Sequence, residues 1–178
     1  MRRTVHGLRI ECISGDISAQ ESFTAVVNAA NAALRPGGGV AGALHRAAGP
    51  GLEEECRPLA PISPGQAVLT GAHHLPNRYV IHCLGPVYGR DRQADELLAA
   101  CYRNALQLAE RHAIDSVAFP SISTGAFGFP LRPAAAIALG TVAGMASRLD
   151  VVERVRFVLF GPEALEEHER VLAQIAKG

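Results

Sequence analysis

The stretch VVNAANAALRPGGGVAG, residues 26–42, decides how this chain is expected to fold and where it is expected to bind a ligand. A short apolar run ends in two asparagines, Asn28 and Asn31. Three glycines follow at 37–39, and a segment of helical character begins at Val40. Glycine lets the backbone approach a ligand closely, and the first N–H groups of a helix are unpaired donors with a partial positive charge. The order of strand, polar turn, glycine loop and helix therefore predicts an anion site that suits a diphosphate.

The composition indicates one ordinary globular domain. The 178 residues are 48% hydrophobic and 19% charged, and the formal net charge is zero. A chain of this length buries a sizeable core, so we expect a single domain over residues 1–178. Proteins that coat nucleic acid or bind membranes through polybasic patches usually carry a net charge of one sign, so both classes are disfavoured. No run approaches the length of a membrane span and no signal peptide is visible, so a cytoplasmic protein is the default expectation.

The cysteines and lysines argue against several chemistries. None of the four cysteines forms a CxxC pair, so we expect reduced core thiols rather than a zinc site or a disulfide framework. Lys177 is the only lysine, which argues against a Schiff base and against a Walker A loop. We therefore predict neither a metal nor a cofactor.

Apolar periodicity alternates between strand and helix along the whole chain. Strands are expected at 8–14, 23–27, 66–70, 79–83, 116–119 and 156–160. Helices are expected at 40–48, 52–59, 94–112, 133–146 and 162–176. This alternation predicts a single α/β domain with helices on both faces of a largely parallel sheet.

Two loops are candidates for ligand binding. The glycines at 37–42 match the pattern G-x-G-x-x-G, but about ten residues separate them from the preceding strand, and residues 59–66 contain no acid. A Rossmann dehydrogenase is therefore disfavoured. The second loop, SISTGAFG at 121–128, also lies between a strand and a helix, where open α/β sheets bind ligands. Its hydroxyls, glycines and aromatic suit a phosphate and a sugar, although a polar turn with one buried Phe explains the same pattern.

Taken together, separated motifs resemble the macrodomain family. They are Gly15-Asp16-Ile17, Val27-Asn28-Ala29-Ala30-Asn31, Gly37-Gly38-Gly39-Val40 and Ile122-Ser123-Thr124-Gly125-Ala126-Phe127-Gly128. The segments Leu44-His45-Arg46-Ala47-Ala48-Gly49-Pro50, Leu75-Pro76, Val80-Ile81-His82 and Ala118-Phe119-Pro120 are similar to the MacroD-type branch. The resemblance covers residues 8–175. It implies a three-layer α/β/α fold with a mixed, largely parallel central sheet, and ADP-ribose as the ligand.

The resemblance also implies roles for single residues. Asp16, next to Ile17, matches the acid that accepts a hydrogen bond from the adenine amino group; a turn or helix cap is the alternative. Phe160 matches an aromatic that lies against adenine, with a core Phe as the alternative. Asn31 matches the asparagine that contacts the distal ribose in hydrolytic members, and we expect it to position a water. Asn28 is expected to tie the turn together. The diphosphate and distal ribose are expected on backbone N–H groups of Gly37, Gly38, Gly39, Val40, Ser123, Thr124, Gly125, Ala126 and Phe127.

Four histidines are interpreted as surface or packing residues, because a histidine is more often one of these than a catalytic group. They are His45, His73, His74 and His82. His82 and Cys83 point to opposite faces of a strand and so make a poor nucleophile–base pair.

The chain departs from the hydrolytic pattern at two positions. Ala41 stands where that pattern carries an aspartate proposed to activate a water, and Phe127 stands where a tyrosine is usual. A general base contributes ~10²–10⁴-fold, so its loss predicts a slower enzyme rather than none. The expected function is a hydrolase of O-acetyl-ADP-ribose, or of mono-ADP-ribose on acidic residues of proteins. A non-catalytic ADP-ribose reader is the alternative, and a nucleic-acid binder is disfavoured by the zero net charge.

Overall fold

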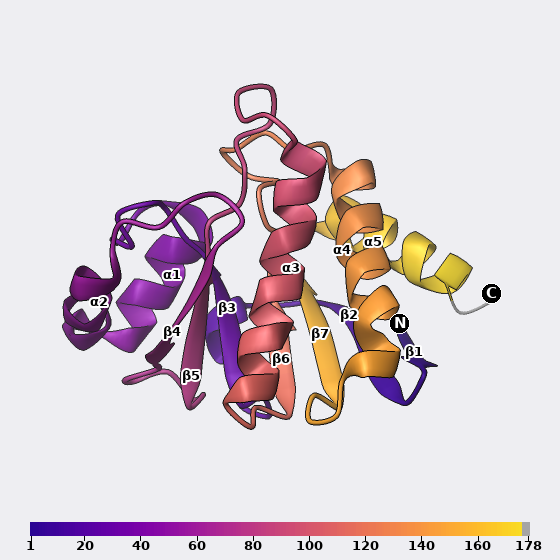
Figure 1. Cartoon of the computed structure of the whole chain (residues 1–178), viewed down its shortest axis with the longest axis horizontal. Coiled ribbons are helices and arrows are strands. Elements are labelled where there is room, and N and C mark those ends of the chain that lie inside the picture. Colours follow the sequence, from indigo (N-terminus) through magenta and orange to yellow (C-terminus); the bar gives the residue numbers. More distant parts are fainter. Residues whose placement is uncertain (176–178) are drawn as a thin grey trace.

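The fold is built on one seven-stranded sheet, seen in a computed structural model that describes residues 1–175 (Figure 1). The strands are β1 (Arg2–Val5), β2 (Leu8–Ser14), β3 (Ala25–Ala29), β4 (Ala67–Gly71), β5 (Tyr79–Cys83), β6 (Ser116–Phe119) and β7 (Arg154–Leu159). Their order across the sheet is β1-β2-β7-β6-β3-β5-β4. The central five strands are parallel, whereas β1 and β4 pair antiparallel at the two edges.

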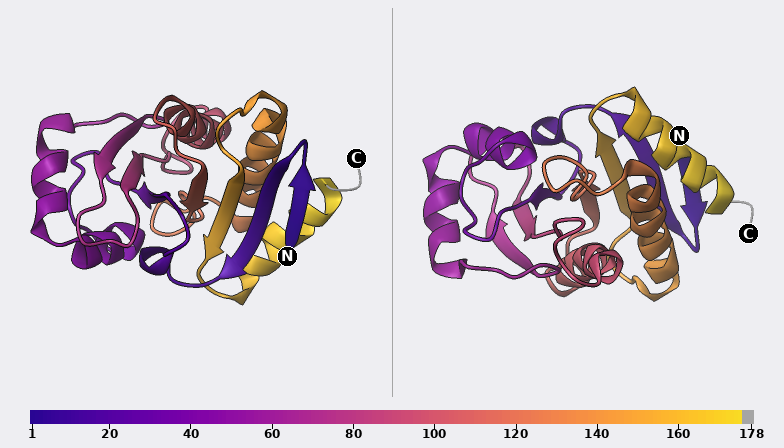
Figure 2. Two further views of the ribbon diagram at one scale, coloured as in Figure 1. Left: turned by 90° about the horizontal axis from the view of Figure 1, so that it is seen from below. Right: turned by 90° about the horizontal axis from the view of Figure 1, so that it is seen from above.

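Helices cover both faces of the sheet, as Figure 2 shows in end-on views. They are α1 (Gly39–Ala48), α2 (Pro50–Cys56), α3 (Ala94–Arg111), α4 (Leu131–Met145) and α5 (Pro162–Ile175), with short 3₁₀ turns η1 (Ile17–Ala19), η2 (Arg57–Leu59) and η3 (Ala146–Arg148). Helices α3, α4 and α5 pack on one face, and α1 and α2 pack on the other. The expected three-layer fold with a mixed, largely parallel sheet is confirmed.

Each face has its own apolar core. Between the sheet and α3–α5, the rings of Tyr102, Phe119 and Phe157 pack with centroids 5.1 to 6.0 Å apart. On the other face, Leu44 and Leu52 of α1 and α2 are fully buried against the sheet. The four cysteines are buried, as expected. No helix within residues 1–175 is both long and apolar enough to cross a membrane.

Most elements lie where the periodicity predicts, and the largest omission is β1. Its first three residues are polar and exposed and only Val5 is apolar, so no apolar alternation marks them as a strand. The pairing of Arg2 with Glu11 on β2, strengthened by an ion pair of 3.1 Å, forms this edge instead. Strand β7 begins two residues earlier than expected, at Arg154, and ends before Phe160. The expected last residue of the final helix, Ala176, lies outside the described residues.

Candidate functional site

Four loops meet at one edge of the sheet because β2, β7, β6 and β3 are parallel neighbours. Their carboxyl ends lead into residues 15–20, 160–161, 120–130 and 30–38 respectively. Figure 2 shows these connections on the same side of the molecule when it is viewed from above. Every ligand-binding residue expected from the sequence lies in these loops or in the first turns that follow them.

Asp16 and Phe160 follow the ends of the neighbouring strands β2 and β7. Ser14 pairs with Leu159, and the N–H of Gly15 donates to the Leu159 carbonyl over 3.3 Å. Phe160 is 98% exposed, so the core alternative for this residue is wrong. A fully exposed phenyl ring at a strand end is available to stack on a planar ligand.

The Asp16 carboxylate caps η1 and stays accessible. Its Oδ1 accepts hydrogen bonds from Ser18 Oγ at 2.7 Å and from Ser18 N at 2.8 Å, and these two bonds lower the pKa of Asp16. The cap and the ligand role are compatible, because each carboxylate has a second oxygen that accepts further bonds. The Ile17 side chain is 7% exposed and packs in the core, so any ligand contact of Ile17 must use its backbone.

The glycine loop presents main-chain donors to solvent. Gly38 is the N-cap of α1 in extended conformation, and Gly39 has a φ of +56°. Residues 37–39 are exposed. Within residues 1–175, none of the backbone N–H groups from Gly37 to Ala41 donates a hydrogen bond. A run of free donors at a helix N-terminus is an anion site without any cationic side chain.

Asn31 fixes the shape of the same loop. Its Oδ1 accepts from the Arg35 N–H at 3.0 Å, and its Nδ2 donates to the Arg35 carbonyl at 2.8 Å. A Cβ at Gly37 would lie 3.4 Å from Asn31 Nδ2, so the amide also borders the glycine loop. The expected turn-tying role of Asn28 is wrong: its Nδ2 lies 3.1 Å from Nδ1 of His82 and joins β3 to β5.

The 121–128 loop, like the glycine loop, has backbone N–H groups that donate no hydrogen bond within the described residues. Its serine and threonine hydroxyls are used internally: Ser123 Oγ donates to the Pro86 carbonyl at 2.8 Å, and Thr124 Oγ1 donates to Ser121. Ser123 has a φ of +67°, a left-handed conformation that residues other than glycine rarely adopt. In the described part of the chain, the N–H groups of residues 124–127 donate no hydrogen bond. Successive free amides in such a turn form an anion-binding nest.

A loop that the sequence analysis left without a role completes the rim. Residues 85–92, between β5 and α3, project beyond the sheet edge in Figure 1. The Tyr88 N–H donates to the Phe127 carbonyl at 2.9 Å, and the Tyr88 ring lies 4.8 Å from that of Phe129. A Cβ at Gly85 would lie 2.1 Å from Ser123 Oγ, so glycine is required there. The signal available was Gly-Pro followed closely by an aromatic and another glycine.

A set of hydrogen-bonded polar side chains is buried between the sheet and helices α1 and α2. His82 has no exposed surface, and its Nε2 lies 2.9 Å from the Thr70 hydroxyl, which donates to the Gly71 carbonyl. If Asn28 Nδ2 donates to Nδ1 of His82, the proton of neutral His82 is on Nε2 and points to Thr70. Burial, together with nearby His45, lowers the pKa of His82 to about 3. Burial also lowers the pKa of His45.

Other polar groups named in the sequence analysis lie at the surface or form no metal-binding cluster in the described residues. His73 is exposed and lies 2.8 Å from Glu55, which agrees with a surface role. No group of three or more His, Cys, Asp or Glu side chains within residues 1–175 could hold a metal ion. Ala41 is 5% exposed in the first turn of α1. The site therefore combines two loops with free backbone N–H groups, an exposed aromatic ring and an exposed carboxylate with a lowered pKa.

Comparison with known proteins finds relatives over nearly the whole chain. The Macro domain family model matches residues 27–138. An O-acetyl-ADP-ribose deacetylase of Salmonella newport is 46% identical over 171 residues, with 93% of this chain and 95% of that protein covered. A Macro domain-containing protein of Methanosarcina mazei is 44% identical, with 94% and 89% covered.

Solved structures show the same similarity in three dimensions. A macrodomain of Oceanobacillus iheyensis, solved with ADP, superposes with a TM-score of 0.95 at 37% identity and covers 99% of this chain and 96% of its own. A Trypanosoma brucei macrodomain in complex with ADP-ribose superposes with a TM-score of 0.85 at 36% identity, covering 92% of this chain and 68% of its own.

Proposed function

The chain belongs to the macrodomain family, and from that premise we propose that it binds ADP-ribose along the carboxyl edge of its sheet and hydrolyses O-acetyl-ADP-ribose or a mono-ADP-ribosyl linkage at the distal ribose. The named activity of the Salmonella relative and the ADP-ribose in the Trypanosoma structure support this proposal.

The order of groups along the sheet edge carries the proposal. Strands β2, β7, β6 and β3 succeed one another, so Asp16, Phe160, the 121–128 loop and the 31–42 stretch also follow in that order. ADP-ribose is itself a linear series of adenine, ribose, diphosphate and ribose. A carboxylate and an aromatic suit the adenine, whereas the two sets of free N–H groups suit the diphosphate and the sugar next to it.

Each expected site residue has a part in this arrangement. Asp16 accepts a hydrogen bond from the adenine amino group, and Phe160 stacks on the adenine ring. Ile17 contacts the ligand through its backbone. The diphosphate and distal ribose lie on two loops, formed by Gly37, Gly38, Gly39 and Val40 and by Ser123, Thr124, Gly125, Ala126 and Phe127. Asn31 contacts the distal ribose with the hydrogen-bonding capacity that remains after its bonds to Arg35.

Hydrolysis in this site must proceed without a side-chain base near the glycine loop. Ala41 and Phe127 carry no titratable group, and the neutral imidazole of His45 is buried at 6% exposed. We propose that a water held by Asn31 and the loop amides is activated by the phosphate of the ligand. The water adds to the acetyl carbonyl of O-acetyl-ADP-ribose, and the ester C–O bond breaks to give acetate and ADP-ribose.

Turnover decides between this hydrolase and a non-catalytic reader, the alternative that Ala41 and Phe127 favour. The assay follows acetate release from O-acetyl-ADP-ribose and loss of ADP-ribose from a mono-ADP-ribosylated protein, beside calorimetry with ADP-ribose, ADP and AMP. Turnover above the buffer rate supports the hydrolase. Tight ADP-ribose binding with no turnover of either substrate supports the non-catalytic ADP-ribose reader.

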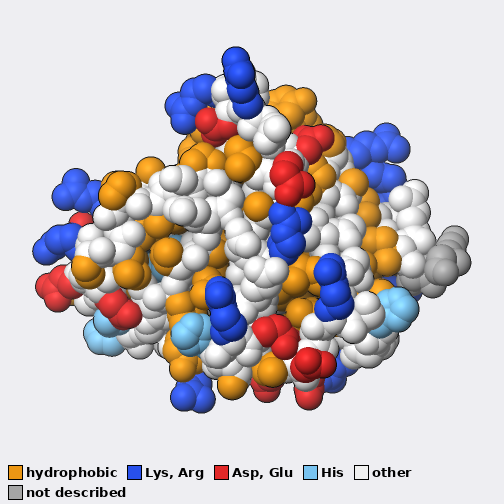
Figure 3. All heavy atoms as spheres, viewed as in Figure 1, with side chains coloured by type: hydrophobic (Ala, Val, Ile, Leu, Met, Phe, Trp, Pro, Cys, Tyr) orange, Lys and Arg blue, Asp and Glu red, His pale blue; other side chains and the backbone are white. Residues whose placement is uncertain are grey.

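Nucleic-acid binding is not proposed. Basic and acidic side chains are interspersed over the face shown in Figure 3, in keeping with the zero net charge. Phosphate-backbone binding would weaken steeply with salt, so binding of ADP-ribose that resists salt, with no RNA shift, distinguishes the two classes.

A further inference from the structure

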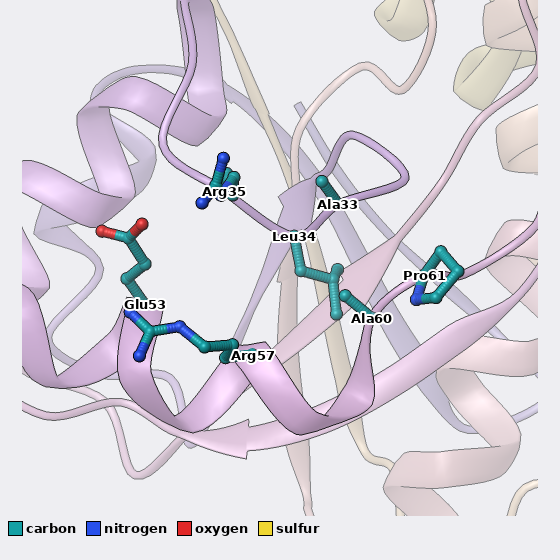
Figure 4. A pocket seen from close by; sticks show the side chains of 7 residues that line it. All are labelled: Ala33, Leu34, Arg35, Glu53, Arg57, Ala60 and Pro61. Carbon is teal, nitrogen blue, oxygen red and sulfur yellow. The ribbon is translucent and has the colours of Figure 1, made fainter.

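A cavity of about 270 Å³ lies between the loop that Asn31 shapes and the end of α2 (Figure 4). One side of the cavity is apolar and is formed by Ala33, Leu34, Ala60 and Pro61. Figure 4 shows the charged side chains of Arg35, Glu53 and Arg57 on the other side. Most of the cavity surface is therefore apolar, and its charged groups lie along one side.

The two arginines of this cavity are uncommitted. Within residues 1–175, neither the Arg35 nor the Arg57 guanidinium forms an ion pair or a hydrogen bond, whereas Arg2, Arg103, Arg156 and Arg170 each pair with a carboxylate. Two guanidiniums beside the one carboxylate of Glu53 leave a net positive charge in the cavity. A guanidinium binds a carboxylate in a two-pronged, directional manner.

The cavity and the proposed distal-ribose site share one piece of main chain. Asn31 holds both the N–H and the carbonyl of Arg35, and the same amide borders Gly37 of the glycine loop. The position of Arg35 is thus fixed relative to the loop that receives the sugar in the proposed function. A group attached to that sugar would leave the site beside this segment.

We propose that this cavity binds the acidic peptide segment of a protein that carries ADP-ribose, with its carboxylates on Arg35 and Arg57. This assignment rests on the proposed function for the identity of the attached sugar. The peptide binding itself depends only on the cavity and its charges.

The lining favours a peptide over a second nucleotide unit. A peptide supplies carboxylates for the two arginines, N–H donors for Glu53 and apolar side chains for Leu34 and Pro61. The cavity lining also contains no aromatic ring on which a base would stack.

The test uses two acetylated peptide amides, Leu-Glu-Leu-Glu-Ala and its glutamine counterpart, titrated into the nitrogen-15-labelled full chain. We expect the glutamate peptide to shift the amide signals of residues 33–35, Arg57, Leu59 and Ala60 and the glutamine peptide to bind at least about fivefold more weakly. Arg57→Glu should weaken binding of the glutamate peptide by a similar factor, and Arg57→Ala should weaken it by less. Arg148 is an exposed arginine on η3, so Arg148→Glu is a control with the same change of charge, and it should change the peptide affinity less than twofold.

Three outcomes would overturn the assignment: signal changes elsewhere on the surface, equal binding of the two peptides, or equal effects of Arg57→Glu and Arg148→Glu. So would an ADP-ribose oligomer that competes with the peptide at these signals and binds more tightly. Calorimetry with free ADP-ribose on the same variants separates the two proposals. If the protein binds the glutamate peptide but not ADP-ribose, the peptide assignment of the cavity stands and the proposed function is rejected. If it binds ADP-ribose but not the peptide, only the peptide assignment is rejected.

Discussion

Gly42 of α1 lies directly against the main chain of Gly37: a Cβ on Gly42 would be 2.3 Å from the Gly37 carbonyl oxygen. Gly42 N also donates to the Gly38 carbonyl at 3.3 Å, so the first turn of the helix and the loop before it form one unit. The positions of the free N–H groups of the glycine loop thus depend on the absence of a side chain one turn later.

Gly42→Ala is expected to weaken ADP-ribose binding at least about tenfold. The alanine methyl displaces the Gly37 carbonyl, which moves donors that must lie within hydrogen-bond distance of the diphosphate. Calorimetry measures the affinity and circular dichroism checks the fold. Gly140→Ala is the matched control: it lies in α4 with open space around its Cβ, and should leave affinity unchanged and raise stability by about 0.5–1 kcal/mol. Equal affinities of both variants would refute the role of the loop.

Phe160→Ala should separate binding from stability. The ring is 98% exposed, so its loss should change the free energy of unfolding by less than about 0.5 kcal/mol. If the ring stacks on adenine, affinity for ADP-ribose and for AMP should both fall about tenfold. Leu59 is another exposed apolar residue, so Leu59→Ala serves as the control and should leave both affinities unchanged. Unchanged affinity for both ligands would remove Phe160 from the site.

Ala41→Asp tests whether the scaffold lacks only a base. The new carboxylate would lie in the first turn of α1, where the helix dipole favours a negative charge. Turnover of O-acetyl-ADP-ribose should rise ~10²-fold or more if the site is otherwise competent. Ala47→Asp places the same group on the exposed last turn of α1 and should have no effect. If neither variant exceeds the native rate, the missing base is not what limits hydrolysis.

The buried histidines predict a loss of stability in mild acid. His82, with its pKa at about 3, and His45 and His168, whose pKa values burial also lowers, are neutral in the folded protein, whereas the unfolded chain protonates all three near pH 6.5. The stabilisation is complete above about pH 6.5 and is lost as the pH falls toward the folded pKa values. Each of these histidines contributes a slope of up to about 1.4 kcal/mol per pH unit.

Urea unfolding between about pH 7 and pH 4 measures this slope. The carboxyl groups with lowered pKa, Glu11, Asp16 and Asp115, have ordinary pKa values of 4.5, 3.8 and 3.8, so they add to the slope only below about pH 5.5, and the slope above that pH belongs to the histidines. His82→Gln should therefore flatten the curve, although it also lowers stability at neutral pH by disturbing Asn28 and Thr70. A wild-type curve that is flat over this range would contradict the burial of neutral histidines.

The layer architecture was predictable because apolar periodicity reports on burial. Helix 94–112 and the strands 79–83 and 116–119 lie within a residue of their expected bounds, since their buried faces repeat clearly. Strand β1 was missed because its exposed polar residues depend on pairing with β2 and on contacts such as that of Arg2 with Glu11. No local pattern reports a partner of this kind.

The candidate site was predictable in its main chain but not in its side-chain bonds. Glycines and loop positions indicate where donors stay free, whereas the partners of Asn28 and Asn31 depend on His82 and Arg35, which only the folded chain brings into place. The exposure of Phe160 likewise follows from where β7 ends, one residue before it. The rim residue Tyr88 acquires its place by bonding to the 121–128 loop.

The free amides of residues 124–127 have a consequence for how this surface can change over evolutionary time. A recognition surface made of main chain does not depend on which side chains decorate it, so most substitutions at Thr124 or Ala126 should be silent in binding. Alanine scanning would not detect such a site, whereas substitutions that change the backbone conformation at Ser123 or Gly85 would weaken binding. In the proposed function, the loop sequence is therefore free to acquire new side-chain specificities while the backbone amides keep their contacts with the anion.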